Sequence, residues 1–305
     1  MSVGASFLQL LVGTVTLRPY VFIFLICYLG FAGRHLGWQR TLIYLATGYL
    51  IAWASELSSI HTGFPYGLYF YIPATVNQEL WFLGVPLMDS LSYVFLTYAS
   101  YSLARLMAAG WQARAGNVNQ AWANGAAKTV LLAAILFMLL DVVIDPLALR
   151  GYRWFLGQIY GYPEYGVYFG VPLSNFAGWL LVGLIMITVL QRLESGSPAP
   201  GRQPAGQKPW ASPPYRGTLL YFGVLCFNMV LTFVIGEMLL GLIAVGLVVL
   251  LTGLALAAGA ALESAVCQPR VPGHVEVAAC REGAPGLSGV GDRNPDGGQI
   301  FQDQI

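Results

Sequence analysis

The segment GYPEYGVYFGVPLSNFAGW, residues 161–179, repeats the character of an earlier part of the chain. Residues 63–93, GFPYGLYFYIPATVNQELWFLGVPLMDSLSY, are also rich in aromatic side chains and also pass through Gly-Val-Pro-Leu into an apolar run. Another apolar run precedes each segment. The chain therefore holds two units with the order apolar run, aromatic loop, apolar run, and both loops are expected on the same side of the molecule.

The composition indicates an integral membrane protein. Hydrophobic residues make up 57% of the chain and charged residues only 10%, whereas soluble domains carry about 25% charged residues. A helix needs about 20 apolar residues to cross the hydrocarbon of a bilayer. On this criterion we predict an all-α, polytopic transmembrane bundle of about seven helices, at roughly 17–33, 40–57, 81–105, 128–146, 168–190, 217–236 and 239–262.

Two helix boundaries stay open at the level of sequence. Residues 5–16 are apolar as well, so they either lie in the membrane interface or lengthen the first helix. Only Gly236 and Glu237 separate the last two predicted helices, and a single long kinked helix there would reduce the count to six.

The distribution of Lys and Arg predicts the orientation in the membrane. The odd-numbered connections carry most of these residues, which places them in the cytoplasm, the N-terminus outside and the C-terminus inside. Arg18 is the exception. We expect a transmembrane domain over 1–263 in a bacterial or archaeal plasma membrane, a flexible cytoplasmic Pro/Gly-rich linker at 195–216 and a disordered tail at 264–305.

The two similar loops predict an internal repeat. Helices 2–3 and helices 4–5 would be parallel copies related by an axis along the membrane normal. The residue two positions beyond the leucine of the Gly-Val-Pro-Leu motif is Asp89 in the first copy and Asn175 in the second. A simpler interpretation is that the motifs only start helices, since Pro suits a first helical turn, and that the Tyr and Trp residues form an interfacial belt.

Four acids are candidates for function because an ionisable group at membrane depth is costly. They are Glu56, Asp89, Asp141 and Asp145, and Glu237 is a weaker fifth. Asp141 and Asp145 are four residues apart, hence on one helix face, where mutual repulsion would keep a proton on at least one. Structural alternatives are that Asp145 ends its helix before a proline, that Asp89 makes a polar contact between helices and that Glu56 is solvated.

Several classes of protein are excluded by what the sequence lacks. The net charge of +1, without a run of Lys or Arg, gives no case for nucleic-acid binding. The three histidines are far apart, so no metal site is predicted. There is no GxGxxG dinucleotide motif. The lysines, Lys128 and Lys208, lie outside the last helix, which excludes a retinal Schiff base there.

Four motifs together resemble the carotenoid biosynthesis membrane-protein family, which includes carotenoid 1,2-hydratases, among them bisanhydrobacterioruberin hydratase. They are ELSSIHTGFPYGLYFY at 56–71, GVPLMDSLSY at 84–93, LLDVVIDP at 139–146 and YFGVPLSNFAGW at 168–179. The resemblance covers roughly residues 15–262 and excludes the linker and tail. It implies a lyase that adds water, without a cofactor or metal, to the terminal double bond of an acyclic carotenoid end group, giving a tertiary alcohol.

Such a reaction needs an acid, aromatic faces for a tertiary cation and a water. Our hypothesis makes Asp145 or Asp141 the proton donor, with Glu56 and Asp89 positioning water or tuning the donor. The predicted substrate-binding residues are Tyr66, Tyr69, Tyr71, Trp81, Tyr93, Trp154, Tyr165, Tyr168 and Asn175.

The expected partners are the acyclic carotenoid, water, membrane lipid and other enzymes of the carotenoid pathway. Two other functions stay open: a non-catalytic membrane protein that binds a carotenoid or lipid, and a transporter, which the predicted repeat and the acids would also suit.

Overall fold

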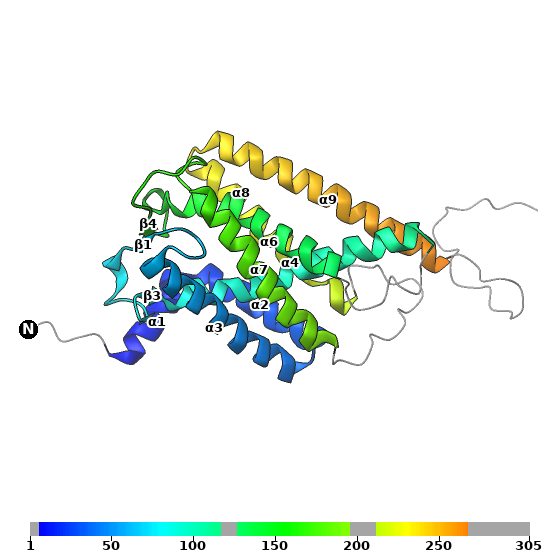
Figure 1. Cartoon of the computed structure of the whole chain (residues 1–305), viewed down its shortest axis with the longest axis horizontal. Helices are drawn as coiled ribbons and strands as arrows, with labels where there is room; N and C mark the ends of the chain where they lie inside the picture. The colour runs from blue at the N-terminus through cyan, green and yellow to red at the C-terminus, as the bar shows by residue number, and fades with distance from the viewer. Residues whose placement is uncertain (1–5, 117–126, 196–211, 268–305) are drawn as a thin grey trace, which may run out of the picture.

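The computed structural model describes residues 6–116, 127–195 and 212–267, and most of this chain is α-helical (Figure 1). The helices in the described ranges are α1 (Phe7–Leu17), α2 (Pro19–His35), α3 (Trp38–Thr62), α4 (Leu87–Arg114), α6 (Ala127–Ala148), α7 (Leu173–Ser195), α8 (Gly217–Val234) and α9 (Met238–Cys267). The 3-10 helices in these ranges are η1 (Pro73–Thr75), η2 (Gly151–Arg153) and η4 (Pro213–Tyr215). The short strands are β1 (Phe70–Tyr71), β2 (Trp81–Phe82), β3 (Val85–Pro86) and β4 (Tyr160–Gly161).

The predicted fold class, an all-α transmembrane bundle, is confirmed. Among the described residues, four helical segments are long and apolar enough to cross a membrane, namely α6, α7, α9 and the segment Pro213–Val234 that joins η4 to α8. The pair α1–α2 would make a fifth span, although it bends by 85° at its break. The structure also separates α8 from α9 at Gly236, whose φ of +78° breaks the helix, so these are two helices and not one kinked helix.

The helix α4 lies at the centre of the bundle. It packs against α2, α3, α6, α7, α8 and α9, and it is more polar than the four apolar segments because other helices cover it. Two of its buried hydroxyls donate to the backbone of the same helix: Thr97 donates to the Tyr93 carbonyl at 2.6 Å, and Ser100 donates to the Leu96 carbonyl at 2.8 Å. In contrast, α9 runs along the outer edge of the bundle (Figure 1).

The two Gly-Val-Pro-Leu motifs adopt similar local conformations. Gly84 and Gly170 have φ of +84° and +95°, and the residues before them, Leu83 and Phe169, also have positive φ. In both motifs the leucine is the first helical residue, so α4 begins at Leu87 and α7 at Leu173. The predicted starts at 81 and 168 were wrong, because left-handed backbone at these positions cannot continue a helix.

The residues before these helices form tight hairpins instead. Trp81 pairs with Pro86 in the antiparallel strands β2 and β3, and Tyr168 pairs with Val171 in an isolated bridge. Each motif therefore ends a hairpin and starts a helix. The larger parallel repeat stays a prediction.

At the end of the bundle away from the aromatic loops, a buried ionic cluster joins three helices. Glu194 on α7 forms an ion pair with Arg105 on α4 and a hydrogen bond with His35 on α2, the latter at 2.7 Å. The Tyr101 hydroxyl donates to the other oxygen of Glu194 at 2.7 Å. All of these side chains are buried, so the cluster fixes α2, α4 and α7 relative to one another.

Parts of the predicted linker and tail lie outside the described residues, namely 196–211 and 268–305. Within the predicted linker, Pro213–Tyr215 form the 3-10 helix η4, and Tyr215 is buried. The helix α9 continues to Cys267, a few residues beyond the predicted domain boundary at 263.

Candidate functional site

Two long connections fold together at one end of the bundle (Figure 1). One joins α3 to α4 and the other joins α6 to α7, and they meet where β1 pairs antiparallel with β4. In this pairing Phe70 lies opposite Gly161, and Tyr71 lies opposite Tyr160. The loops that the sequence marks as similar are therefore direct neighbours, and they cover the space between the helices from which they emerge.

Beneath these loops lies a cavity of about 130 Å³. A buried water needs roughly 10–15 Å³ by the same kind of measure, so the cavity has room for several waters or for water beside the end of an apolar chain. Its lining is mostly aromatic and aliphatic, with polar groups at a few places. The carboxyl groups among these are those of Glu56, Asp89 and Asp145.

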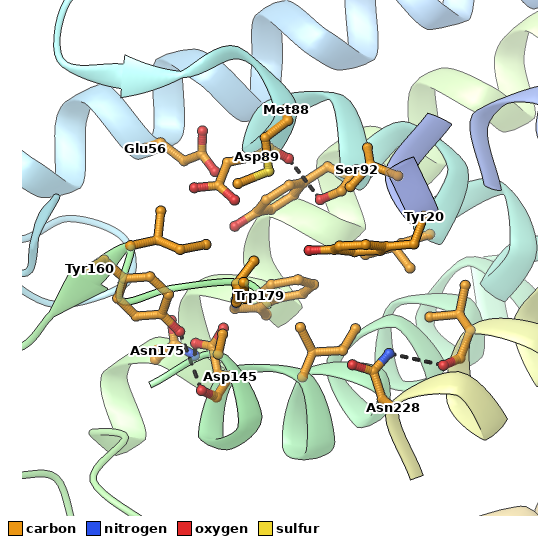
Figure 2. A pocket seen from close by; sticks show the side chains of 18 of the residues that line it. Tyr20, Glu56, Met88, Asp89, Ser92, Asp145, Tyr160, Asn175, Trp179 and Asn228 are labelled. Atoms are coloured by element: carbon orange, nitrogen blue, oxygen red, sulfur yellow. Dashed lines mark hydrogen bonds between the residues drawn. The ribbon is translucent and has the colours of Figure 1, made fainter. Parts of the chain in front are cut away.

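Asp145 and Asn175 form one polar side of the cavity (Figure 2). The Asn175 amide nitrogen donates to Asp145 Oδ2 at 2.6 Å and to Asp141 Oδ2 at 2.7 Å. Two carboxyl oxygens that share one amide nitrogen lie close together. Asp141, one turn earlier on α6, is buried but is not part of the cavity lining. Its Oδ1 has no hydrogen-bond partner among the described residues, so this atom is free to hold a proton or a water.

Asp145 does not end its helix. Although Pro146 follows it, α6 continues to Ala148, and the Leu149 amide donates to the Asp145 carbonyl at 2.9 Å. A proline inside a membrane helix is tolerated where neighbouring groups satisfy the freed backbone. Asp145 therefore lies inside α6 and is not its last residue.

Glu56 and Asp89 lie on the opposite side of the cavity (Figure 2). Glu56, near the end of α3, is buried and not solvated, and it accepts a short hydrogen bond from the Ser90 hydroxyl on α4. Asp89 occupies the third position of α4, as Asn175 does in α7. The Tyr71 hydroxyl lies near both acids, and it accepts a hydrogen bond from the Tyr69 hydroxyl at 3.5 Å. Acids from α3, α4 and α6 thus face one shared space.

Four tyrosines from the two loops, Tyr69, Tyr71, Tyr160 and Tyr162, pack edge to face above the acids. Their ring centroids lie between 5.4 and 6.5 Å apart. Burial raises the pKa of all four hydroxyls above the ordinary tyrosine range. They therefore stay neutral at physiological pH, where they can donate hydrogen bonds but cannot act as phenolate bases.

The predicted substrate-binding residues divide into two groups. Five of them line the cavity, namely Tyr69, Tyr71, Tyr93, Trp154 and Asn175. The other four, Tyr66, Trp81, Tyr165 and Tyr168, do not line it. Tyr66, Trp81 and Tyr168 pack on other aromatic rings, Tyr93, Tyr71 and Phe169, with ring centroids 6.2, 5.9 and 4.9 Å apart, respectively. Tyr165 is 85% exposed.

The cavity lining also includes residues that the sequence analysis did not select. Trp179 stacks on Tyr93 with centroids 4.8 Å apart, and Tyr20 stacks on Phe227 at 5.2 Å. Asn228 on α8 is the polar group at the far end from the acids (Figure 2). Trp179 belongs to the similar segments and could have been chosen for that reason. Tyr20 and Asn228 lie in ordinary apolar runs, which carry no signal of their position.

Glu237 lies apart from the cavity. It pairs with Arg150 at 2.9 Å and with Arg153 at 2.5 Å, so it joins the α6–α7 connection to the start of α9. Arg18, the exception to the charge rule, is buried and paired with Glu79. This pairing explains how an Arg can lie at the end of the bundle that carries the aromatic loops.

The sequence matches the carotenoid biosynthesis protein family over residues 6–255. The chain belongs to this family. Within it, the chain is similar to bisanhydrobacterioruberin hydratase from Haloarcula japonica, with 33% identity over 141 residues. That match covers 45% of this chain and 40% of the relative, so the chain spans about two-fifths of the relative's length. No solved structure matches the chain.

Proposed function

We propose that this chain adds water to the terminal carbon–carbon double bond of an acyclic carotenoid end group and produces a tertiary alcohol. The observation that carries the proposal is the position of Asp145, which shares Asn175 with a second acid and faces an aromatic cavity with further acids across it. Membership of the carotenoid biosynthesis family and similarity to a hydratase give additional support.

Asp145 is the proton donor in this mechanism. Two carboxylates bound to one amide nitrogen repel each other, so the pair with Asp141 is most stable when it keeps one proton. The alkene π electrons take that proton from Asp145, and a C–H bond forms at the less substituted carbon. The positive charge then lies on the tertiary carbon. The faces of Tyr93, Trp179 and Tyr160 line the same space and would stabilise this cation by cation–π interaction.

Glu56 and Asp89 position the water and accept its proton. A water between them and the cation forms the new C–O bond with an oxygen lone pair, and its extra proton passes to one of these carboxylates. Waters in the cavity return this proton across to Asp145, which restores the starting state. One alkene and one water give one alcohol. No electrons are exchanged with another reactant, so this reaction requires no redox cofactor.

The direct test is pigment analysis of a lycopene-producing strain with and without this gene. The proposal expects a new carotenoid whose mass exceeds that of its precursor by one water, with a tertiary hydroxyl group. Recovery of the purified protein with unmodified pigment would instead indicate the non-catalytic binder. Carotenoid or solute flux that depends on a proton gradient, without a new product, would indicate the transporter. Either of these outcomes would contradict the proposed hydration.

A further inference from the structure

The short helix α1 exposes a continuous apolar face. Successive residues of a helix are turned by about 100°, so positions three and four apart share a side. The exposed large side chains on this side are Phe7, Leu8, Leu11, Val12 and Val15. Phe7 and Leu8 are 71% and 68% exposed, which would be unfavourable for so many neighbouring apolar side chains in water.

The other sides of α1 have different chemistry. Gln9 and Thr16 are exposed and lie together along one polar edge of the apolar face. Gly13 and Thr14 face the protein: a Cβ atom on Gly13 would lie 1.7 Å from the Gln78 carbonyl oxygen, and the Thr14 hydroxyl accepts a hydrogen bond from the Leu80 amide at 2.8 Å. The helix therefore has one protein face, one apolar face and one polar edge, in that order around its axis.

The direction of α1 is fixed by the bend at Arg18. The axes of α1 and α2 differ by 85°. If α2 crosses the bilayer, α1 lies nearly in the plane of the membrane at the end where the aromatic loops gather (Figure 1). On α2, beyond the bend, Ile23 and Ile26 are also exposed apolar side chains.

A buried ion pair anchors the bend. Arg18 donates to Glu79 at 3.5 Å, and the two side chains are 2% and 0% exposed. The Thr75 hydroxyl makes a short hydrogen bond to the same Glu79 oxygen. Removing one partner of a buried pair leaves an uncompensated charge, so the pair holds α1 against the α3–α4 connection.

We propose that α1 is an in-plane membrane helix that binds the lipid leaflet at the loop end of the bundle. The apolar face enters the boundary between headgroups and acyl chains with Phe7, Leu8, Leu11, Val12 and Val15, and Gln9 and Thr16 face the headgroup water. Lipid is the occupant favoured by the structure because α1 exposes a row of large apolar side chains bordered by a polar edge, and α2 beyond the bend exposes apolar side chains as well. This inference does not depend on the proposed hydration.

The test is spin-label accessibility in the full chain, reconstituted in vesicles of phosphatidylcholine and phosphatidylglycerol. Cys27, Cys226, Cys267 and Cys280 are replaced by alanine, and single cysteines for nitroxide labelling are introduced in separate variants. The labelled positions on α1 are Leu8, Leu11, Val15, Gln9 and Thr16. Collision with oxygen, which concentrates in lipid, is compared with collision with a water-soluble nickel chelate. The expected oxygen-to-nickel ratio is several-fold higher at the three apolar positions than at Gln9 and Thr16.

Two labelled positions outside α1 provide the reference values. Ile26 on the exposed face of α2 gives the ratio for lipid, and the exposed Glu164 in the α6–α7 connection gives the ratio for water. A ratio at Leu11 equal to that at Glu164 would overturn the proposal, because the face would then lie in water. Exclusion of both reagents from Leu11, with normal oxygen collision at Ile26, would also overturn it, because another protein surface would then cover α1.

Discussion

Tyr71 lies directly opposite Tyr160 in the antiparallel pairing of β1 with β4. This pairing brings the two halves of the site together, because Tyr71 lies near Glu56 and Asp89, whereas the Tyr160 hydroxyl donates to the Asp145 backbone carbonyl at 3.4 Å. The loop pairing therefore links the two acidic sides of the cavity.

The aromatic ring of Tyr160 should contribute more to the hydration rate than its hydroxyl group does. Tyr160→Leu removes a cation-stabilising face worth about 2 kcal/mol when desolvated, which predicts about a 30-fold lower hydration rate. Tyr160→Phe keeps the ring and should retain most activity. Because burial raises the pKa of Tyr160 above its ordinary value of about 10, the hydroxyl stays protonated below that pH. The pH–rate profiles of Tyr160→Phe and the native protein should therefore coincide there, and divergence near neutral pH would contradict this.

Asp145→Asn should abolish most hydration. The amide cannot deliver a proton, and loss of general acid catalysis predicts a decrease of about 100-fold or more, measured as hydroxylated product per amount of folded protein in a lycopene-producing host. Asp141→Asn should cause a smaller decrease because Asp141 does not line the cavity. The matched control is Glu164→Gln, an exposed acid on the same side of the molecule. Full activity of Asp145→Asn would remove Asp145 as the donor.

Asn175→Leu should act through the acid pair. Without the shared amide, Asp145 loses its 2.6 Å hydrogen bond and keeps the longer one from the Tyr162 hydroxyl at 3.3 Å, so kcat should fall by about tenfold or more with little change in KM. Ser174→Ala, at the neighbouring position, is the control, since the Ser174 hydroxyl only donates to the Tyr66 carbonyl. The double variant Asn175→Leu/Asp141→Asn should lose less transition-state stabilisation, measured from kcat, than the sum of the losses in the two single variants. Strict additivity would show that the pair does not act as a unit.

Gly178→Ala should loosen the first aromatic loop from α7. A Cβ atom there would lie 2.5 Å from the Tyr66 ring and 2.7 Å from the Pro65 carbonyl oxygen, and such overpacking costs about 1–3 kcal/mol. Gly223→Ala on α8 is the matched control, because its Cβ would meet nothing within 4 Å. Thermal unfolding in detergent should show a lower midpoint for the first variant only. Equal unfolding midpoints for the two variants would mean that the loop moves to accommodate the added methyl group without a loss of stability.

Glu194→Gln should weaken the fold without altering the chemistry. The change leaves Arg105 buried without its carboxylate, which costs about 3–5 kcal/mol, and unfolding in detergent measures this loss. The cluster is at the end of the bundle away from the cavity, so product formed per folded molecule should stay constant. A specific loss of activity in well-folded Glu194→Gln protein would show that this cluster takes part in the reaction.

The sequence alone supplies the class of fold and the family. Runs of apolar residues long enough to cross a bilayer predict the helical bundle, because hydrocarbon admits only backbone whose hydrogen bonds are satisfied internally. The motifs around Glu56, Asp89 and Asp145 identify the carotenoid biosynthesis family, which the match over residues 6–255 confirms. Helix starts are less predictable: α4 and α7 begin after their prolines because positive φ at Leu83 and Phe169 prevents an earlier start.

Only the tertiary structure decides which side chains share a space. The sequence pairs Asp141 with Asp145 by helical spacing. The Asn175 amide that joins them comes from a different helix, α7, on the other side of the α6–α7 connection. The sequence also treats Tyr69 and Tyr165 alike, although one lines the cavity and the other is exposed. Local pattern fixes which residues form helices, whereas the packing of distant helices and loops determines the direction of each side chain.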